Sequence, residues 1–355
     1  MDTQELIFTN NVGETIDNIV RQLNPTKLFV LVDVNTESFV LPRLKAMSQA
    51  VSDATLIVTR AGDMNKKLDS TQYIWQRLGD EGATRHSLLI NLGGGVVTDM
   101  GAFAASTFKR GISFINVPTT LLGAVDASVG GKTGINFGNL KNQIGVFSQA
   151  DTVIVSTLFF NTLNDEELRS GYAEMLKHAL LENADTFNNL LGRHVEDIDP
   201  DELLDLLQKS VLIKKDIVDT DPEEKSIRKA LNLGHTAGHA FESLALERKS
   251  PIPHGYAVAY GLVTELVLSN MKLSFPSDVL HRYAAYVREV YPGFHFTCDD
   301  YPRLLELMHH DKKNLAASDI NFTLLRSIGD VTIDCIVGEE DIKSALDITR
   351  DLLGI

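Results

Sequence analysis

The amino-acid sequence predicts an α/β N-terminal domain built on a parallel, Rossmann-like sheet, followed by an all-α C-terminal domain. Two observations lead to this prediction. Up to about residue 156 short apolar runs alternate with amphipathic stretches, and from residue 157 onward nearly every apolar pattern has helical spacing. At 355 residues the chain is also long enough for two domains, which we place at 1–156 and 157–355.

The N-terminal half alternates predicted strands with predicted helices. The strands are expected at 27–33, 54–59, 87–92 and 112–118, and the helices at 39–51, 70–82 and 96–108. Such alternation favours parallel pairing through βαβ crossovers, because a parallel strand needs a long connection back to the same edge. In sheets of this kind, ligands bind at the carboxyl ends of the strands.

The C-terminal half has apolar residues at helical spacing in six segments. These predicted helices span 165–183, 201–219, 235–247, 256–274, 279–290 and 341–353. A single short apolar stretch at 320–329 predicts a lone hairpin. We therefore expect this half to be mostly helical.

The composition excludes several classes of protein. The formal net charge of −15 argues against a nucleic-acid binder or a membrane-surface binder, because both need a positive face. The sequence lacks both an apolar run long enough for a membrane span and a signal-peptide pattern at its start. Its two cysteines, Cys298 and Cys335, lie far apart, which is typical of a reducing compartment. We expect a cytoplasmic protein that binds a small molecule.

Three consecutive glycines follow the third predicted strand and open a helix. Gly93, Gly94 and Gly95 would let an anion approach the backbone and the first N–H groups of that helix, with Asp99 in its first turn. A tight turn without a ligand is the alternative. Asp33 at a strand end and the hydroxyls of Thr119 and Thr120 favour a nucleotide. The pattern is not G-x-G-x-x-G, yet some dinucleotide site is the better interpretation.

A possible metal site lies in the helical half. His235 and His239 are four residues apart and project from one helix face, His254 begins another helix, and Glu174 lies in a third. Two imidazoles and a carboxylate suit Zn²⁺ or a similar ion and leave a position open for substrate oxygens. The alternative is a histidine pair that serves only packing.

Many candidate anion-binding groups surround these motifs. They are Arg110, Lys132, Lys141, Asn142, Lys177, Lys214, Arg228 and Asn232. A solvated surface charge is the alternative for each of them, and it is strongest for Lys214 and Lys215 on a helix.

Taken together, these segments resemble the 3-dehydroquinate synthase family of sugar-phosphate cyclases. The matching strings appear in the family's order across about residues 90–265, and they are GGGVVTDMGAFAASTFKRG, VPTTLLGAVDASVGGKTGIN, LKNQIGVF, GYAEMLKH, LNLGHTAGHAFE and HGYAVAYG. A match in so many parts is far more specific than any single motif.

The resemblance implies roles for individual residues. It implies one divalent metal, Zn²⁺ or Co²⁺, held by Glu174, His235 and His254. The implied NAD-contacting residues are Asp33, Asn35, Lys66, Gly93, Gly94, Gly95, Asp99, Thr119, Thr120, Leu122 and Thr162. The implied substrate-site residues are Asp126, Lys132, Lys141, Asn142, Lys177, Lys214, Glu224, Arg228, Asn232 and His239, of which Asp126, Lys132 and Lys141 also border the cofactor.

Two further matches concern the substrate phosphate. Arg110 matches an arginine that reaches the neighbouring subunit's phosphate, which implies a homodimer, and either Lys312 or Lys313 matches another phosphate-side lysine. The sequence also departs from the family pattern. Asp63 stands where glutamate is usual, so its contact with NAD stays open, Ser226 replaces a glycine, and the loop NFGNLKN differs from the commoner NxPxGKN form.

The resemblance also implies a reaction. The family converts 3-deoxy-D-arabino-heptulosonate 7-phosphate, a sugar phosphate with a carboxylate, into 3-dehydroquinate and phosphate in the shikimate pathway of aromatic amino-acid biosynthesis. The steps are a transient oxidation by NAD⁺, β-elimination of phosphate, re-reduction and an intramolecular aldol closure. Three alternatives stay open: another sugar-phosphate cyclase, a metal-dependent alcohol dehydrogenase of the glycerol dehydrogenase type, and a silent NAD-binding protein.

Overall fold

The computed structural model describes residues 4–138, 140–309 and 320–355. Within them the chain forms two compact units: one comprises the described residues of 1–164 together with 199–211, and the other comprises those of 165–198 and 212–355. The predicted domain boundary after residue 156 stays a prediction. None of the helices in the described part of the chain is both long and apolar enough to cross a membrane.

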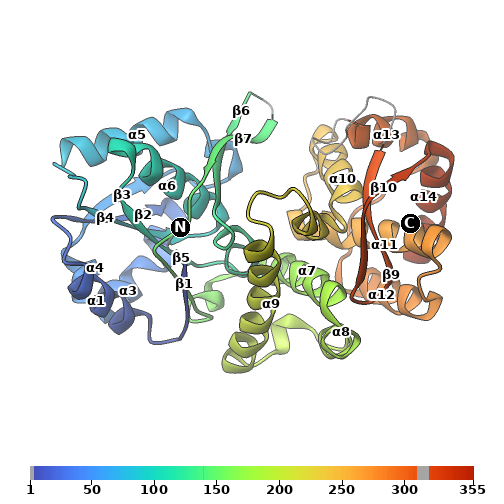
Figure 1. The fold of residues 1–355 in the computed structure, drawn as a ribbon, viewed down its shortest axis with the longest axis horizontal. Coiled ribbons are helices and arrows are strands. Elements are labelled where there is room, and N and C mark those ends of the chain that lie inside the picture. The colour runs from blue at the N-terminus through green and yellow to red at the C-terminus, as the bar shows by residue number, and fades with distance from the viewer. Residues whose placement is uncertain (1–3, 139, 310–319) are drawn as a thin grey trace. The chain divides into compact units, whose positions relative to one another are not determined.

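The first unit is organised around a six-stranded sheet whose pairings are all parallel (Figure 1). Its order is β1 (Glu5–Phe8), β8 (Thr152–Val155), β5 (Ser113–Pro118), β4 (Leu88–Gly93), β2 (Leu28–Asp33) and β3 (Thr55–Thr59). The four strands predicted from the sequence are confirmed, whereas β1 and β8 were not predicted. The chain runs from β2 to its neighbour β3 on one side, and it then returns to β4 on the other side of β2. The strand order therefore reverses between β2 and β4, and this is the switch point of the sheet.

Helices cover both faces of this sheet (Figure 1). Alternate strand residues such as Val30, Val32 and Ile90 pack with Val12 and Leu44 in one core on the side of the first helices. The other face is covered by α6 (Gly95–Thr107), the helix that follows β4, and α5 (Leu68–Asp80) packs on α6. The other helices of this unit are α1 (Val12–Leu23), α2 (Val34–Phe39), α3 (Leu41–Met47) and α4 (Gln49–Asp53).

A second, two-stranded element was not predicted. The glycine-rich run after β5 forms an antiparallel hairpin of β6 (Lys132–Phe137) and β7 (Leu140–Phe147), which packs on α6. Two glycines with positive φ, Gly130 at 103° and Gly131 at 68°, lead the chain into β6. Every residue of β7 is exposed, including its apolar residues Leu140, Ile144, Val146 and Phe147.

The second unit is mostly helical and is built around α11 (His254–Leu273). This helix is apolar around most of its circumference and contacts neighbours on several sides, as expected of a helix buried in a core. The other helices are α7 (Asp165–Glu182), α8 (Ala184–Leu191), α10 (His235–Glu247), α12 (Ser277–Val290), α13 (Tyr301–His309) and α14 (Glu339–Leu353). A further helix, α9 (Pro200–Thr220), begins in the first unit and ends in the second.

The fold class is confirmed, with one addition in the second unit. The hairpin expected at 320–329 is longer than predicted, because β9 (Ile320–Ser327) pairs with β10 (Asp330–Val337) beyond the predicted stretch. The six predicted helices are present, whereas α8 and α13 were not predicted. The added hairpin packs through β9 against α11, so it is part of the core of this unit.

Candidate active site

The carboxyl ends of β2 and β4 meet at the switch point of the sheet. Asp33 ends β2, and Gly93 ends β4, where its carbonyl accepts the Thr119 N–H at 3.0 Å. One Asp33 carboxylate oxygen accepts the Thr36 N–H at 2.8 Å and so caps α2, the helix that carries Asn35. The structure therefore brings the predicted strand-end residues to the edge where nucleotides bind in such sheets.

The three glycines also have a packing role. A Cβ on Gly93 would lie 2.6 Å from the Val97 Cβ, and one on Gly94 would lie 3.1 Å from the Thr120 Cγ2. The turn thus needs glycine for its own close packing as well as for any ligand. Gly94 caps α6 without a side chain, so the first amides of α6 lack an intrahelical acceptor and can face an anion. Asp99 is the fifth residue of α6 and so lies just past its first turn, one residue further along the helix than predicted.

A hydrogen-bonded cluster around the buried Lys66 joins three predicted residues that are far apart in the sequence. The Lys66 side chain is 5% exposed, and its Nζ donates to the Asp99 Oδ2 and to the Asn142 Oδ1, both at 2.5 Å. The backbone N–H of Asn142 in turn donates to the Asn136 Oδ1 at 2.9 Å. The hairpin β6–β7 is therefore tied to α6 through Lys66.

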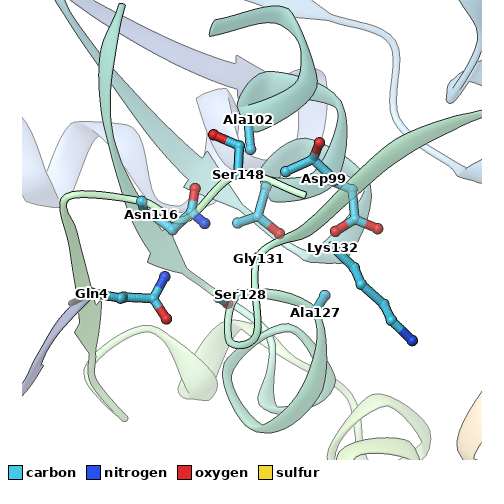
Figure 2. A pocket seen from close by; sticks show the side chains of 12 residues that line it. Gln4, Asp99, Ala102, Asn116, Ala127, Ser128, Gly131, Lys132 and Ser148 are labelled. Atoms are coloured by element: carbon cyan, nitrogen blue, oxygen red, sulfur yellow. The ribbon is translucent and has the colours of Figure 1, made fainter. Parts of the chain in front are cut away.

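A small polar pocket lies beside this cluster (Figure 2). Its lining joins the predicted residues Asp99 and Lys132 with Gln4, Asn116 and Ser128, none of which the sequence singled out. Asn116 is fixed by a hydrogen bond of 2.9 Å from the Asn91 side chain across β4 and β5. Figure 2 shows that the Lys132 amino group points away from the centre of the pocket. The amino group of Lys132 thus faces outward from the hairpin.

Four of the remaining predicted cofactor residues lie just after the carboxyl end of β5. Thr119, Thr120 and Leu122 follow β5, and Asp126 lies in the π-helical turn Gly123–Ala127. The Thr120 Oγ1 accepts the Gly123 N–H at 3.0 Å. The other two positions lie in different surroundings: the Thr162 hydroxyl donates to the Phe159 carbonyl at 2.7 Å, and the Lys141 Nζ lies 3.8 Å from the Asp63 Oδ2 on an exposed pair.

Arg110 lies at the opposite end of α6 from the glycine turn. It belongs to a turn in which Lys109, Arg110 and Gly111 all have positive φ, at 50°, 69° and 113°. The thirteen residues of α6 span about 20 Å, so this turn lies at the amino edge of the sheet. Arg110 is therefore not brought to the strand-end site of its own unit.

The second unit brings the three predicted metal ligands together. The Glu174 Oε1 on α7 lies 3.4 Å from the His235 Nε2 and 3.7 Å from the His254 Nε2. Each histidine is the first residue of its helix, α10 and α11 respectively. The ring nitrogens of His235, His239 and His254 also approach one another within 4.8 Å. Three helices thus converge on one small volume.

Hydrogen bonds on the far side of each ring fix its orientation. The His235 Nδ1 lies 3.1 Å from the Leu233 carbonyl, and the His254 Nδ1 lies 3.3 Å from the Glu242 Oε2. Each ring therefore presents its Nε2 toward Glu174, in the arrangement by which metal-bound histidines are held.

The chemistry of this set fits a divalent cation. Glu174 is fully buried, and neither of its carboxylate oxygens has a hydrogen-bond donor in suitable geometry, although the Lys177 Nζ forms a close ion pair with Oε2. A buried carboxylate beside two imidazoles is a suitable donor set for Zn²⁺ or Co²⁺. The His239 ring lies next to this set, with its centroid 5.2 Å from that of His235.

Several predicted anion-binding residues are buried in the same unit. Lys177, Lys214 and Arg228 are 1%, 6% and 2% exposed, so the solvated-surface alternative is wrong for these three. The Arg228 Nη1 donates to the Pro222 carbonyl at 2.6 Å, and the Asn232 side chain donates to the Glu224 Oε1 at 3.3 Å.

Three carboxylates with a clear role in this unit were missed from the sequence. Asp221 accepts backbone N–H groups of the turn that leads to Arg228, Glu242 holds His254, and Glu265 accepts backbone N–H groups at the start of α10. A contact between a carboxylate and backbone amides leaves no periodic pattern in the sequence, so Asp221 and Glu265 gave no signal. Only Glu242, next to the histidine motif, offered one. The predicted choice between Lys312 and Lys313 lies outside the described residues.

Comparison with known proteins identifies the family of this chain. Family models described as 3-dehydroquinate synthase N-terminal and C-terminal match residues 56–170 and 171–314. The 3-dehydroquinate synthase of Parabacteroides distasonis is 45% identical over 355 residues, which cover 100% of both chains.

Two solved structures are similar over nearly the whole chain. A 2-deoxy-scyllo-inosose synthase complexed with carbaglucose-6-phosphate, NAD⁺ and Co²⁺ has a TM-score of 0.85 at 20% identity, covering 98% of this chain and 96% of that chain. The 2-epi-5-epi-valiolone synthase ValA from Streptomyces hygroscopicus, with NAD⁺ and Zn²⁺ bound, has a TM-score of 0.84 at 25% identity, covering 99% and 98%. The matching family models and the full-length relative show that the chain belongs to the 3-dehydroquinate synthase family.

Proposed function

We propose that this protein converts 3-deoxy-D-arabino-heptulosonate 7-phosphate into 3-dehydroquinate and phosphate, with NAD⁺ and one divalent metal as cofactors. Membership of the family supports the overall cyclisation. The observation that supports the chemistry is the convergence of the buried Glu174 carboxylate with the Nε2 atoms of His235 and His254. These three residues are the proposed ligands of the metal.

The cofactors supply what side chains cannot. A divalent cation held by the three ligands supplies Lewis-acid polarisation of a substrate hydroxyl, and NAD⁺ at the carboxyl ends of β2 and β4 supplies a reversible hydride acceptor. Asp33 is proposed to take ribose hydroxyls, and the first amides of α6 after Gly94 are proposed to take the pyrophosphate. Lys66 and Asp99, which are paired with each other beside α6, are proposed to border the cofactor.

The buried cations of the second unit are proposed to bind the substrate. Lys214 and Arg228 would hold its carboxylate, since Arg forms a bidentate pair with a carboxylate and both side chains are shielded from water. Lys177 and the linked pair Glu224 and Asn232 would orient the hydroxyl groups.

The phosphate is the group on which the reaction depends, because its departure makes the cyclisation possible. The resemblance of the sequence motifs to the family implies four residues as its ligands: Lys132, Asn142, His239 and Arg110. Oxygens of the substrate phosphate are proposed to accept the proton that is lost during β-elimination, so that no further side-chain base is required.

We also propose a homodimer in which Arg110 serves the neighbouring subunit. The location of Arg110 supports this, because the turn at 109–111 lies at the amino edge of the sheet and the nucleotide end of the sheet lies at the carboxyl edge. An Arg110 that served its own strand-end site would have to span about 20 Å of helix.

The test is phosphate release from the heptulosonate substrate, measured with and without chelator and with and without added NAD⁺. We expect release that depends on both cofactors, without net accumulation of NADH. Net NADH would instead favour an alcohol dehydrogenase, and a preference for a sugar phosphate lacking the carboxylate would favour another cyclase.

A pair of histidine variants links the activity to the site. His235→Ala should abolish phosphate release, whereas His281→Ala on the exposed face of α12 should retain it. Full retention of dehydroquinate formation in His235→Ala would contradict the proposed metal site. No activity in the metal-loaded wild type would favour a silent NAD-binding protein.

A further inference from the structure

A fully buried carboxylate lies behind the proposed metal site. Glu265 belongs to the middle of α11 and has no exposed surface. Its Oε2 accepts the Gly234 N–H at 2.6 Å, and its Oε1 accepts the Ala237 N–H at 3.1 Å. Both donors belong to the start of α10, so one carboxylate of one helix binds the first turn of another.

The start of α10 has no cap of its own. Its N-cap is Gly234, which has a φ of +80° and no side chain to accept a hydrogen bond. A Cβ at Gly234 would lie 2.6 Å from the Leu262 Cγ, so a serine or aspartate cap cannot be placed there. Glu265 supplies the missing acceptor from α11, and its negative charge is favourable at the positive end of the helix dipole.

This contact lies directly beside the proposed metal ligands. His235 follows Gly234 and precedes Ala237, so the two hydrogen bonds bracket it, and His239 lies one turn further along α10. The helix that carries Glu265 begins with His254. A bond between Glu265 and the start of α10 therefore fixes the positions of two histidine-bearing helices relative to each other.

Close packing of the two backbones makes this bond specific. A Cβ on Gly261 would lie 2.0 Å from the Gly234 carbonyl oxygen, and a Cβ on Gly238 would lie 2.9 Å from the Ala257 carbonyl oxygen. The backbones of α10 and α11 are therefore in direct contact next to the carboxylate of Glu265.

We propose that Glu265 is a positioning residue of the metal site: it holds the first turn of α10 so that the Nε2 of His235 meets Glu174 and the Nε2 of His254. The inference rests on the proposed function, because it needs a metal at these residues. It predicts that loss of the carboxylate lowers the free energy of metal binding by more than it lowers the free energy of unfolding.

The experiment measures Co²⁺ binding to the apoprotein through the visible absorption of the ion, together with thermal unfolding in chelator. Glu265→Gln keeps the shape and removes the charge and one acceptor. We expect its dissociation constant for Co²⁺ to rise by about tenfold or more, as for other partners behind metal ligands, with a changed absorption band.

Thr264→Val is the matched control. Thr264 is the preceding residue on α11 and is also fully buried, but its hydroxyl contacts the Thr349 hydroxyl of α14 at 3.2 Å and the Tyr260 carbonyl of α11 itself at 3.3 Å. This variant should lose thermal stability and keep the wild-type dissociation constant and absorption band. If the Glu265→Gln constant stays within twofold of the wild type, or if both variants weaken Co²⁺ binding equally, the positioning role is wrong.

Two further measurements keep the test decisive. If Glu265→Gln does not fold, Glu265→Asp retains the charge but shortens the reach, and wild-type affinity in that variant overturns the inference. The wild type and His235→Ala are titrated in parallel. If His235→Ala binds Co²⁺ as tightly as the wild type, the proposed metal site itself is refuted. If His235→Ala loses Co²⁺ binding but Glu265→Gln binds as tightly as the wild type, only the role of Glu265 is refuted.

Discussion

Lys177→Met tests how the protein holds a buried carboxylate at the proposed metal site. The side chains of Glu174 and Lys177 are 0% and 2% exposed, and their charges form a close ion pair one turn apart on α7. Methionine retains most of the volume of lysine but removes the cation. Removing one partner of a buried pair costs about 3–5 kcal/mol, because the remaining charge stays buried without compensation.

The size of the effect can be worked out for the apoprotein. For a unit of this size, a loss of 1 kcal/mol lowers the unfolding temperature by about 2–4 °C, so Lys177→Met should unfold roughly 6–20 °C lower in chelator. Excess Zn²⁺ or Co²⁺ brings positive charge to Glu174 and should restore most of this loss. The metal-induced rise in unfolding temperature should therefore be larger in Lys177→Met than in the wild type, as measured by calorimetry.

Lys215→Met is the matched control on α9. Lys215 pairs with Asp219 one turn away, but these side chains are 28% and 49% exposed. Such surface pairs are worth about 0.3–0.5 kcal/mol, so its unfolding temperature should change by less than about 2 °C and its response to metal should equal that of the wild type. Equal losses for the two variants in chelator, or an unchanged metal response in Lys177→Met, would refute the reasoning.

Two further predictions concern the units separately. Gly101→Ala places a Cβ 2.0 Å from the Asn91 Oδ1 and should lower the free energy of unfolding in urea by about 1–3 kcal/mol. Gly79→Ala on α5 meets no atom within 4 Å and should raise this free energy by up to about 1 kcal/mol. Equal effects of the two variants would show that α6 can shift away from the sheet. Burial raises the pKa of the Asp221 carboxyl, but three backbone N–H bonds outweigh it and lower this pKa below the ordinary 3.8. The resulting stability is complete above pH 3.8 and is lost as the pH falls through the lowered value, so Asp221→Asn should flatten the acid limb of a stability–pH curve.

The sequence allowed the central strands and most helices to be predicted, because β2 to β5 are apolar runs of five or six residues between clear turn signals. The strands β1 and β8 have only four residues each, which is too short for a periodic signal. β10 was not predicted, although Val331, Ile333, Cys335 and Val337 stand at every second position. Its pairing with β9 is interrupted between Thr332 and Cys335, where Asp334 has a φ of +57°.

The site was predictable only where its residues are close in the sequence. The spacing of His235 and His239 places both on one face of α10, which four-residue spacing indicates directly. By contrast, the meeting of Glu174 with His254 depends on how α7 packs against α11, and the meeting of Lys66 with Asn142 depends on a hairpin that was not predicted. Family resemblance supplied these residues, and local pattern alone did not.

Glycines determine how closely the ligand-bearing helices approach. A Cβ on Gly255, beside His254, would lie 1.9 Å from the Ser170 carbonyl oxygen of α7, the helix that carries Glu174. Gly234, beside His235, and Gly261 allow the same closeness between α10 and α11. Because each of these two histidines is the first residue of its helix and is flanked by such a glycine, backbone contact between helices places their ring nitrogens within 4 Å of one carboxylate oxygen. The precision of the proposed metal site therefore comes from backbone packing. Substitution of these glycines should weaken metal binding before it lowers the stability of the sheet in the first unit.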